Sequence, residues 1–455
     1  MDLFRILSST SGALGAQTAG LDVTGQNIAN VNTPGYVRRT LDLSEIAPVD
    51  QSSAGNGVTV DRIIAQRAPL LDARIRVEQA AVGRESAVSD RLSILQTEIS
   101  SPGTAADAAL TSFYDAWSTL AQDPTSGVGR QQVVSQGQAL ARVFNNLSAS
   151  LVSAQQGADS EIRSDVQQVN DLAARIAQLN VAIGAAPATT GETLRDEQQQ
   201  ALQDLASLVD VSVIDRASGG ADVYIGNGRA LVVGENAYSL ATVSKAPSGL
   251  ADITSGGTTI TSEITGGRIG GLIQARDVLI PDYQGRVDNL AYGVVSSVNA
   301  AHQAGFDLGG NAGGDFFSPL ASPAGAAAAM AVSSSVAANP NLIAAAGTPA
   351  PGDNQNARAI SDLRNAALPG GTTNPTDTWG ALIYRVGADT QTAQGELQSH
   401  QDVVSQIQSL RDQVSGVSID EEAASMLKFQ RAYEANARFF SAVDQTLDAL
   451  IQMVP

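Results

Sequence analysis

The sequence lacks cysteine altogether and has few aromatic residues, and both shortages narrow the classes of protein that it can encode. Without cysteine, the 455-residue chain has no disulfide, no thiolate metal site and no cysteine nucleophile. Aromatic residues make up 4% of the chain, so the apolar fraction of 43% is mostly aliphatic and favours thin seams between helices. No run of about 18 apolar residues exists, so we expect no membrane insertion. The first residues also lack the basic and apolar regions of a cleaved secretory signal.

Charge and histidine content exclude further classes. The chain has 27 basic and 46 acidic residues, which gives a net charge of -19. Because affinity for phosphate backbones comes from clustered lysine and arginine, we expect no nucleic-acid partner. His302 and His400 are the only histidines, so a metal site or a Ser/His/Asp triad would have to use one of them. We interpret His302 as a helix-end residue hydrogen-bonded to the following loop, and His400 as a solvated residue on a polar helix.

The spacing of apolar residues divides the chain into helical and strand-like parts. In residues 70–208 the spacing is helical, and one stripe steps by three and four residues: Val169, Leu172, Ile176, Leu179 and Ile183. Residues 209–265 are rich in β-branched residues and contain Gly-Gly and Gly-Asn-Gly turns, which predicts hairpins. Helical patterns return on either side of a glycine-rich loop and a low-complexity Ala/Ser/Pro segment.

These patterns predict an α+β fold in which both chain ends form one α-helical bundle or coiled-coil rod, with a β-rich domain displayed from the middle. The expected parts are an N-terminal segment of a helix, a turn and extended strands (1–69), a long-helix domain (70–208), a β-rich domain (209–265), helices that return to the rod (266–305), a loop and low-complexity part (306–353), and C-terminal helices that close the rod (354–455).

The sequence from Ser418 onward predicts the clearest helix of the chain. Ser418 is a natural N-cap, Glu421 follows three residues later as in a capping box, and Asp420 and Glu422 add negative charge to the first turn. Two columns recur every seven residues, as in a coiled coil. The first contains Met426, Tyr433, Phe440, Leu447 and Val454; the second contains Ala423, Gln430, Ala437, Asp444 and Ile451; Leu427 adjoins this seam.

This helix is not expected to be stable alone. Burying its large apolar residues contributes roughly 10–15 kcal/mol. Ordering each of its residues costs about 1 kcal/mol or more, which exceeds that sum over the whole helix. The helix therefore needs a partner, which could be the N-terminal helix, a neighbouring subunit or a chaperone. We expect both termini to be poorly ordered in the monomer and to fold on assembly.

A cluster of turn-forming residues interrupts the alanine-rich N-terminal region at IANVNTPGYVRRT. Its residues are Asn30, Asn32, Thr33, Pro34, Gly35 and Tyr36. Asparagine and threonine side chains can bind local backbone, proline fixes φ, and glycine allows a positive φ, so the segment should stop the N-terminal helix. Tyr36 should anchor the extended segment that follows. Arg38 and Arg39 either pair with acidic neighbours across a subunit interface or form a solvated edge.

The turn resembles the signature shared by bacterial flagellar rod, hook and hook-associated proteins. The segment SGVSIDEEAASMLKFQRAYEANARFF resembles the C-terminal signature of the same axial proteins, and SGVSIDEEAA is similar to the form found in the hook-associated protein 1 family. The stretches VYIGNGRALVVG, GGRIGGLIQARD, VNAAHQAGFDLGGNAGGDFF and NPNLIAAAGTPAPGDNQNARAISDLRN resemble the central region of that family, in the same order.

The resemblance implies a non-enzymatic structural protein of the hook–filament junction. It implies export, unfolded, through the flagellar type III apparatus from the cytoplasm, and assembly at the distal end of the extracellular hook. The implied partners are further copies in a ring or helical layer, hook protein, hook-associated protein 3, and a cytoplasmic export chaperone at the C-terminal helix. The chain is shorter than many members, so we expect a reduced outer domain, trimmed at residues 321–353.

Two glycine-rich motifs are interpreted as turns, and we expect neither a cofactor nor a metal. GGRIGG lacks the G-x-x-x-x-G-K-[ST] pattern of a nucleotide-binding loop. Asp307, Asn311 and Asp315 are spaced loosely like calcium ligands, but Ala312 and Ser318 stand where an EF-hand needs glycine and glutamate. The alternatives are another axial protein of hook or rod type and, from a different class, a secreted enzyme that uses His302.

Overall fold

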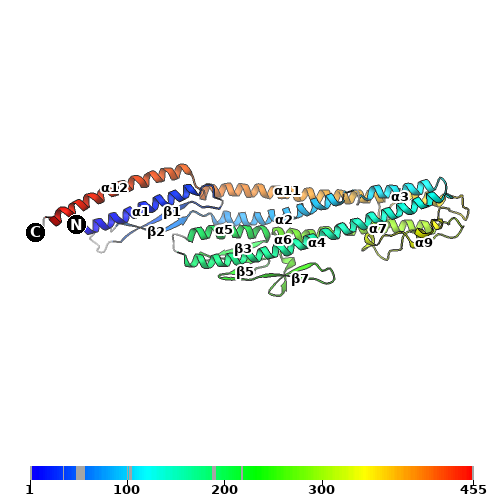
Figure 1. The fold of residues 1–455 in the computed structure, drawn as a ribbon, viewed down its shortest axis with the longest axis horizontal. Coiled ribbons are helices and arrows are strands. Elements are labelled where there is room, and N and C mark those ends of the chain that lie inside the picture. The colour runs from blue at the N-terminus through cyan, green and yellow to red at the C-terminus, as the bar shows by residue number, and fades with distance from the viewer. Residues whose placement is uncertain are drawn as a thin grey trace.

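Long helices run side by side along nearly the whole length of the molecule (Figure 1). The computed structural model describes residues 3–33, 35–47, 57–99, 101, 105–186, 191–216 and 219–452. Helix α4 (Gly127–Ala185) has 59 residues and spans about 90 Å at 1.5 Å per residue. Its N-terminus is capped by Ser126, whose hydroxyl accepts from the backbone N–H of Gly129.

The first and last helices, α1 (Leu3–Ala29) and α12 (Ile419–Gln452), pack against each other at one end of the molecule. A hairpin of β1 (Arg39–Glu45) and β2 (Val58–Ala65) lies against α1. Gly20 permits the close approach of the two helices, because a Cβ there would lie 2.6 Å from the ring of Phe429 on α12. We call these four elements the rod, and the remaining elements the body.

The body is a bundle of long helices that meets the rod at the chain connections and at α5, which contacts β2. Its antiparallel pair of α2 (Pro69–Ile99) and α11 (Pro375–Ser415) runs beside α4. The other helices are α3 (Ala106–Leu120), α5 (Gly191–Leu208), α6 (Gly267–Gln274), a π-helical turn (Ala275–Leu279), α7 (Ile280–Gln303), α8 (Ala326–Ala329), α9 (Ser334–Ala338) and α10 (Gln355–Asp362). Short 3-10 turns occur at Thr261–Glu263, Pro340–Leu342 and Leu363–Asn365.

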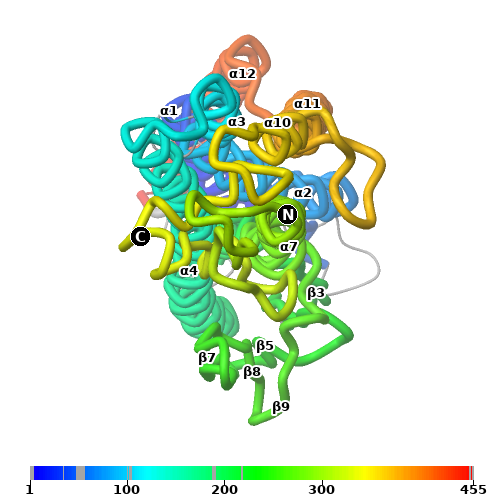
Figure 2. Tube along the Cα trace, turned by 90° about the vertical axis from the view of Figure 1, so that its right-hand side faces the viewer, coloured from blue at the N-terminus to red at the C-terminus, as the bar shows by residue number. Residues whose placement is uncertain are grey.

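Two small antiparallel sheets project from one side of the body (Figure 2). The first contains β3 (Val211–Asp215), β4 (Ala221–Ile225), β5 (Arg229–Val233) and β6 (Asn236–Ala237), and the second contains β7 (Leu240–Ser244), β8 (Ala251–Ser255) and β9 (Thr258–Thr259). Two asparagines of α4 bind strand backbones. Asn170 binds both backbone groups of Leu240, and Asn180 binds both of Ala221. The polar face of α4 therefore fixes the position of the two sheets along the helix.

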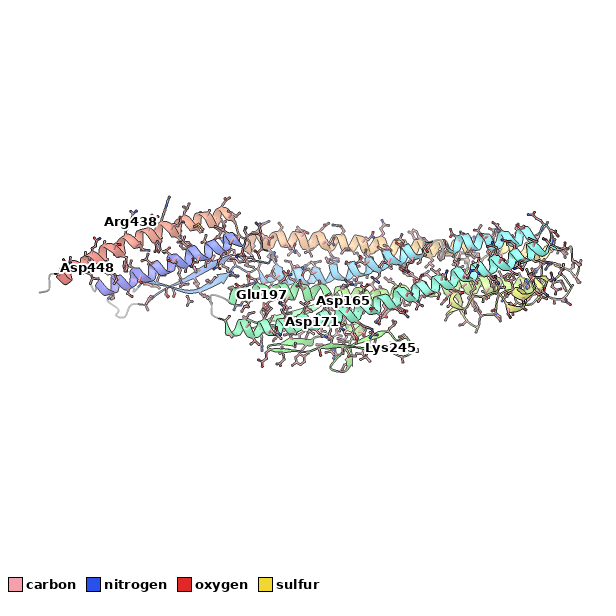
Figure 3. The ribbon with its side chains drawn as sticks, in the orientation of Figure 1. Asp165, Asp171, Glu197, Lys245, Arg438 and Asp448 are labelled. Carbon is pink, nitrogen blue, oxygen red and sulfur yellow. The ribbon has the colours of Figure 1, made fainter. Side chains whose placement is uncertain are left out.

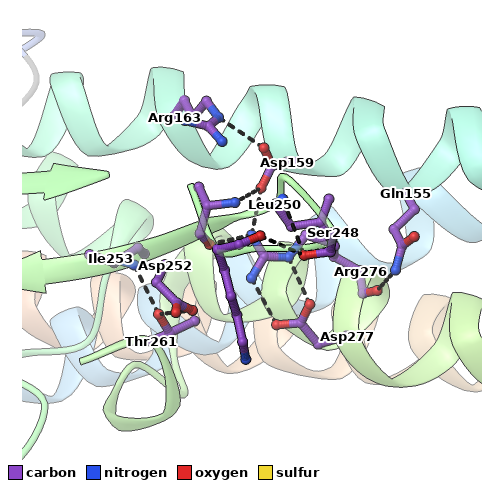
Figure 4. A network of polar contacts seen from close by, with 12 residues as sticks. Gln155, Asp159, Arg163, Ser248, Leu250, Asp252, Ile253, Thr261, Arg276 and Asp277 are labelled. Carbon is purple, nitrogen blue, oxygen red and sulfur yellow. Dashed lines mark hydrogen bonds and ion pairs between the residues drawn. The ribbon is translucent and has the colours of Figure 1, made fainter. Parts of the chain in front are cut away.

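A buried ionic network also fixes the second sheet to the helices (Figure 4). Asp159 of α4 accepts hydrogen bonds from the Ala251 backbone N–H, from Arg276 (both at 2.7 Å) and from Arg163 at 2.8 Å. The Arg276 guanidinium also binds Asp277 and the Ala251 carbonyl. Burial alone would raise the pKa of Asp159, but these hydrogen bonds outweigh it and hold the pKa below its ordinary value. The carboxylate is therefore ionised at neutral pH.

The apolar core has two parts, and both lie in the body. One cluster joins α3, α7 and the first part of α4 around the aromatic rings of Phe113, Trp117, Phe316 and Phe317. The second joins the later part of α4 with α5, α6 and the sheets. Glycines bring helices close here, since a Cβ at Gly271 would lie 2.2 Å from the Arg84 carbonyl of α2. The GGRIGG motif thus serves a helix start and a close helix crossing.

Two expectations need correction or refinement. His400 is not simply solvated, because its Nδ1 lies 2.8 Å from Glu78 Oε2 across the α2–α11 contact. The low-complexity segment folds against the body, and it contributes fully buried residues such as Ala327 and Ile343 to the core. Among the described helices, none combines the length and the apolar character that a membrane span requires.

Candidate functional site: a polar joint between rod and body

The predicted turn ends α1 as expected. The Asn30 side chain binds the Gln26 carbonyl, Thr33 binds the Asn30 side chain, and the Tyr36 N–H donates to the Thr33 carbonyl. Gly35 has a φ of 79°, in the region that favours glycine. Asn32 is exposed, and Pro34 lies outside the described residues.

Asn27, which the sequence pattern did not single out, is the centre of this region. Its side-chain oxygen accepts from the Arg39 backbone N–H at 3.0 Å and from the Tyr36 hydroxyl at 2.9 Å. Its amide nitrogen donates to the Arg39 carbonyl at 2.9 Å and to Glu422 at 3.0 Å. All four hydrogen-bonding positions of a fully buried asparagine are thus used. Burial raises the pKa of Tyr36, so its hydroxyl keeps the proton that it donates.

Glu422 connects this turn to the C-terminal helix. It is almost completely buried, and its second oxygen accepts from Arg38 Nε at 2.8 Å, while Arg38 also binds Glu421 at 2.7 Å. The helix-start acids therefore do more than complement a helix dipole, because they pair α12 with the segment that follows α1. Both arginines of the motif pair with acidic residues of the same chain, so the structure has neither of the two expected arrangements, which were pairing across a subunit interface and a solvated edge.

A second group of charges ties the rod to the body at α5. Asp196 accepts from Arg39 at 3.0 Å and from Arg67 at 2.6 Å, and Arg67 also binds Glu192. Burial raises the pKa of Asp196, although the two guanidiniums oppose the shift. The backbone of Arg38 adds a bond to Ser415, the last residue of α11. We call the contacts of Asn27, Arg38, Arg39, Asp196 and Glu422 the joint.

The face of α12 that packs on α1 differs from the predicted seam. A heptad column of Glu422, Phe429, Asn436 and Val443 is buried or partly buried, and Phe429 lies against Gly20. The predicted seam lies on the adjoining strip of the helix. Within that seam Met426, Ala437, Phe440 and Leu447 are partly buried, Ala423, Leu427, Gln430 and Tyr433 are exposed, and the Ile451 side chain lies outside the described ones. Val454 also lies outside the described residues. A contact of this strip with a subunit or a chaperone stays a prediction.

His302 is held by the loop that follows its helix, as interpreted from the sequence. It is completely buried, its Nδ1 lies 2.7 Å from the Gly314 carbonyl oxygen, and its Nε2 accepts from the Ala344 N–H at 2.9 Å. Burial lowers its pKa, and the neutral ring with its proton on Nδ1 satisfies both contacts. Both ring nitrogens are therefore occupied, which leaves neither for a catalytic proton transfer.

The loop considered for calcium is also engaged in its own contacts. Asp307 accepts from the backbone and side chain of Asn311, and Asp315 accepts from Gln303. Over the part of the chain that the structure describes, no group of three or more His, Cys, Asp or Glu is placed to hold a metal.

Comparisons with known proteins match the chain at its middle and at both ends. Residues 92–317 match the family model described as flagellar hook-associated protein FlgK helical domain. Residues 7–36 match the model of the flagella basal body rod protein, and residues 411–453 match that of the flagellar basal body rod FlgEFG protein C-terminal. Most of α1 and all of α12 thus lie within models named for proteins of the flagellar basal body rod.

Full-length relatives and a solved structure agree with these matches. The chain is 28% identical to flagellar hook-associated protein 1 of Bacillus subtilis, over 98% of each chain, and 23% identical to that of Escherichia coli, over 98% of this chain and 99% of the relative. The fold is similar to that of the flagellar hook junction protein FlgK from Burkholderia pseudomallei, with a TM-score of 0.67 at 18% identity, over 75% of this chain and all of that one. The chain is therefore similar, over nearly its whole length, to flagellar hook-associated protein 1, a structural protein of the bacterial flagellum.

Proposed function

We propose that this chain is a structural junction protein between the flagellar hook and the filament. The observation that carries the proposal is the joining of both chain ends into one rod by α1, α12 and the joint, on a chain that matches the hook-associated family over nearly its whole length. Terminal helices packed in this way can continue a tubular assembly by contacts with neighbouring copies. The chain is exported through the flagellar type III apparatus from the cytoplasm and takes its place at the distal end of the hook, outside the cell.

The exposed strip of α12 is the proposed contact with other proteins. It presents Leu427 and Tyr433, which are 54% and 41% exposed, beside the half-buried Met426 and Phe440. Met426, Tyr433 and Phe440 stand at heptad spacing, and apolar side chains spaced in this way favour a helical partner. Before export the partner is a cytoplasmic chaperone, and after assembly it is a neighbouring copy. Hook protein and hook-associated protein 3 are the expected neighbours below and above the layer.

Electron microscopy of cells that lack the gene tests this function. We expect complete hooks without filaments, with flagellin released into the medium. A cell without hooks would move the assignment to a rod or hook protein, a second candidate that the matches of both chain ends to basal body rod models favour. Normal filaments and motility would contradict both assignments.

Complementation with variants tests the role of the α12 strip. Tyr433→Asp should fail to restore filaments, because it places a charge in the proposed helix contact. Ala435→Asp is the matched control, since this exposed residue lies two positions further along and thus points to another side of the helix. Equal loss or equal retention of filaments in both variants would contradict the proposed surface.

A further inference from the structure

The outer side of the helix pair α2 and α11 carries large apolar side chains that the described residues leave uncovered. Four of them are between 45% and 87% exposed: Leu70 and Val77 on α2, and Leu410 and Val414 on α11. The two helices form one edge of the bundle (Figure 2). Single exposed apolar residues are common on protein surfaces, whereas several on one face mark a contact with another molecule.

The four residues lie close together along the helix pair. A contact between Glu78 and His400 fixes the height of the two antiparallel helices relative to each other. Leu70 precedes Glu78 by about two helical turns, and Leu410 follows His400 by about three. Since the helices run in opposite directions, both displacements lead toward the rod. Leu70 and Leu410 therefore lie at similar heights, and Val77 lies about two turns further into the body.

Helical periodicity also places the four residues on the same side of the pair. On α2, Leu70 and Val77 are displaced by about a quarter of a turn from Glu78, which meets α11. On α11, Leu410 and Val414 are displaced in the same rotational sense from the residue that meets Glu78, by at most about a quarter of a turn. Equal senses of rotation on antiparallel helices lead to the same side of the pair. We call these four exposed side chains the flank patch.

The surroundings of the flank patch carry little charge. Neutral residues of the two helices adjoin it: Ala73, Gln406 and Gln413. Arg74 is charged, but it is paired with Glu78 at 2.9 Å. The whole chain has a net charge of -19, and acidic side chains such as Asp171 and Glu197 lie on α4 and α5 (Figure 3). Copies with the same net charge repel each other, so a face without unpaired acidic residues is where two copies can approach.

The size of the flank patch limits what it can hold. Its four side chains expose roughly 150–300 Å² of apolar surface. A stable pair of proteins in solution buries about 800 Å² on each partner. The flank patch is therefore too small to hold two free molecules together, but it suits copies that other contacts already place side by side.

We propose that the flank patch contacts a second copy of this chain within the assembled layer, where a helix of the neighbouring copy lies along α2 and α11. The proposal rests on the proposed junction function, because that function supplies the layer. All four residues belong to the body, so the contact does not depend on the packing of α1 against α12. In a closed ring such contacts are heterologous, so the flank patch meets a different surface of the neighbour.

Photocrosslinking in cells tests this contact directly. Leu410 is replaced by the photoreactive residue p-benzoylphenylalanine, cells with assembled flagella are irradiated, and adducts in the isolated hooks and filaments are identified by mass spectrometry. We expect a dimer of this chain. The purified chain should sediment as a monomer and give no dimer on irradiation. Ser409 is the matched control position, because it is also exposed and points about a quarter of a turn away.

Three results would overturn the proposal. The first is the absence of a dimer at Leu410 although the chain is present in the assembled structure. The second is an adduct with a different protein, which would assign the flank patch to that partner. The third is an equal yield of dimer at Ser409 or from the purified chain, because the contact would then be neither specific to the flank patch nor confined to the layer.

Complementation separates this contact from the junction function itself. In cells that lack the gene, Leu410→Asp should lower the number of filaments by about tenfold or more, because it places an unpaired charge in the contact. Ser409→Asp should restore them, and the amount of each variant released into the medium shows whether it is made and exported. Full restoration by Leu410→Asp would overturn the contact and leave the junction function intact. Normal filaments without the gene would instead contradict the junction function.

Discussion

The rod and the body obey different rules of stability, although both are built from long helices. The body has two apolar clusters whose members are almost wholly shielded, including an aromatic group around Phe113 and Trp117. In the rod, α12 buries Glu422 and Val443 against α1 and leaves large apolar side chains such as Leu427 and Phe439 exposed. The comparison shows that the length of a helix does not determine whether it is stable without partners. A helix bundle with a shared core stands alone, whereas the rod relies on buried hydrogen bonds and on partners.

The largest effect should come from the body core. Phe113→Ala should lower the free energy of unfolding of the body by about 3–5 kcal/mol, because it leaves a cavity against Trp117 and Phe316. Urea titration followed by tryptophan fluorescence checks this, since both tryptophans, Trp117 and Trp379, belong to that cluster. Phe439→Ala, at a residue of α12 that is 53% exposed, should change it by less than about 0.5 kcal/mol. Similar losses of unfolding free energy in both variants would contradict the expected difference between the body core and the surface of α12.

A buried charge should control the rod more than its apolar contacts do. Glu422→Ala removes one of the two acceptors of the Asn27 amide and leaves Arg38 without a buried partner, so the rod should lose about 3 kcal/mol of stability. Amide hydrogen exchange in α1 and α12 should accelerate while that of the body stays constant. Asp420→Asn, at an exposed residue of the same helix turn, should leave the exchange unchanged. Accelerated exchange in the body would show that the two regions are coupled.

Two glycines of α1 sharpen the comparison within the rod. Gly20→Ala places a methyl group against the Phe429 ring, and the overpacking should destabilise the rod by about 1–3 kcal/mol. Gly25→Ala meets no atom within 4 Å, so it should stabilise α1 by about 0.5–1 kcal/mol through helix propensity. Exchange rates of α1 amides separate the two signs. Two variants with the same sign would mean that α12 does not pack closely at Gly20.

The last effect depends on pH and belongs to the body. Burial lowers the pKa of His302 below its ordinary value of 6.5, so the unfolded chain binds a proton that the folded chain does not. Stability from this group is therefore complete above pH 6.5 and falls at lower pH, by at most about 1.4 kcal/mol per pH unit. Urea titrations between pH 7.5 and pH 5, compared with His302→Gln, isolate its contribution. Equal slopes in the two chains would contradict a neutral buried ring.

Local signals predicted the boundaries of the fold well. The break around residues 415–418 is found between the end of α11 at Ser415 and the start of α12 at Ile419. The hairpin region is found as β3 to β9, between Val211 and Thr259. Turn residues and β-branched runs act on their immediate neighbours, so a reading of the sequence captures them.

Contacts between distant segments were not predictable in the same way. The column of α12 that covers α1 contains two polar residues, Glu422 and Asn436. The neighbouring column, with Met426 and Phe440, is more apolar, so the sequence pattern favours that column instead. Asn27 also carries no local sign that its partner lies 395 residues away. An acidic residue at a helix start is already explained by the helix dipole, so its pairing with a distant segment cannot be recognised from the sequence. A buried partner becomes visible only when the fold brings the segments together.

The distance along the chain between Asn27 and Glu422 also sets the order in which the molecule can be completed. Closing a loop of 395 residues is entropically costly, and the helix that closes it is the last one made. A growing chain can finish its two apolar clusters while α1 still waits for α12. A prematurely terminated chain would have a folded body and an uncovered N-terminal helix. The hydrogen bond between Asn27 and Glu422 can therefore form only in a chain that has been translated beyond Glu422.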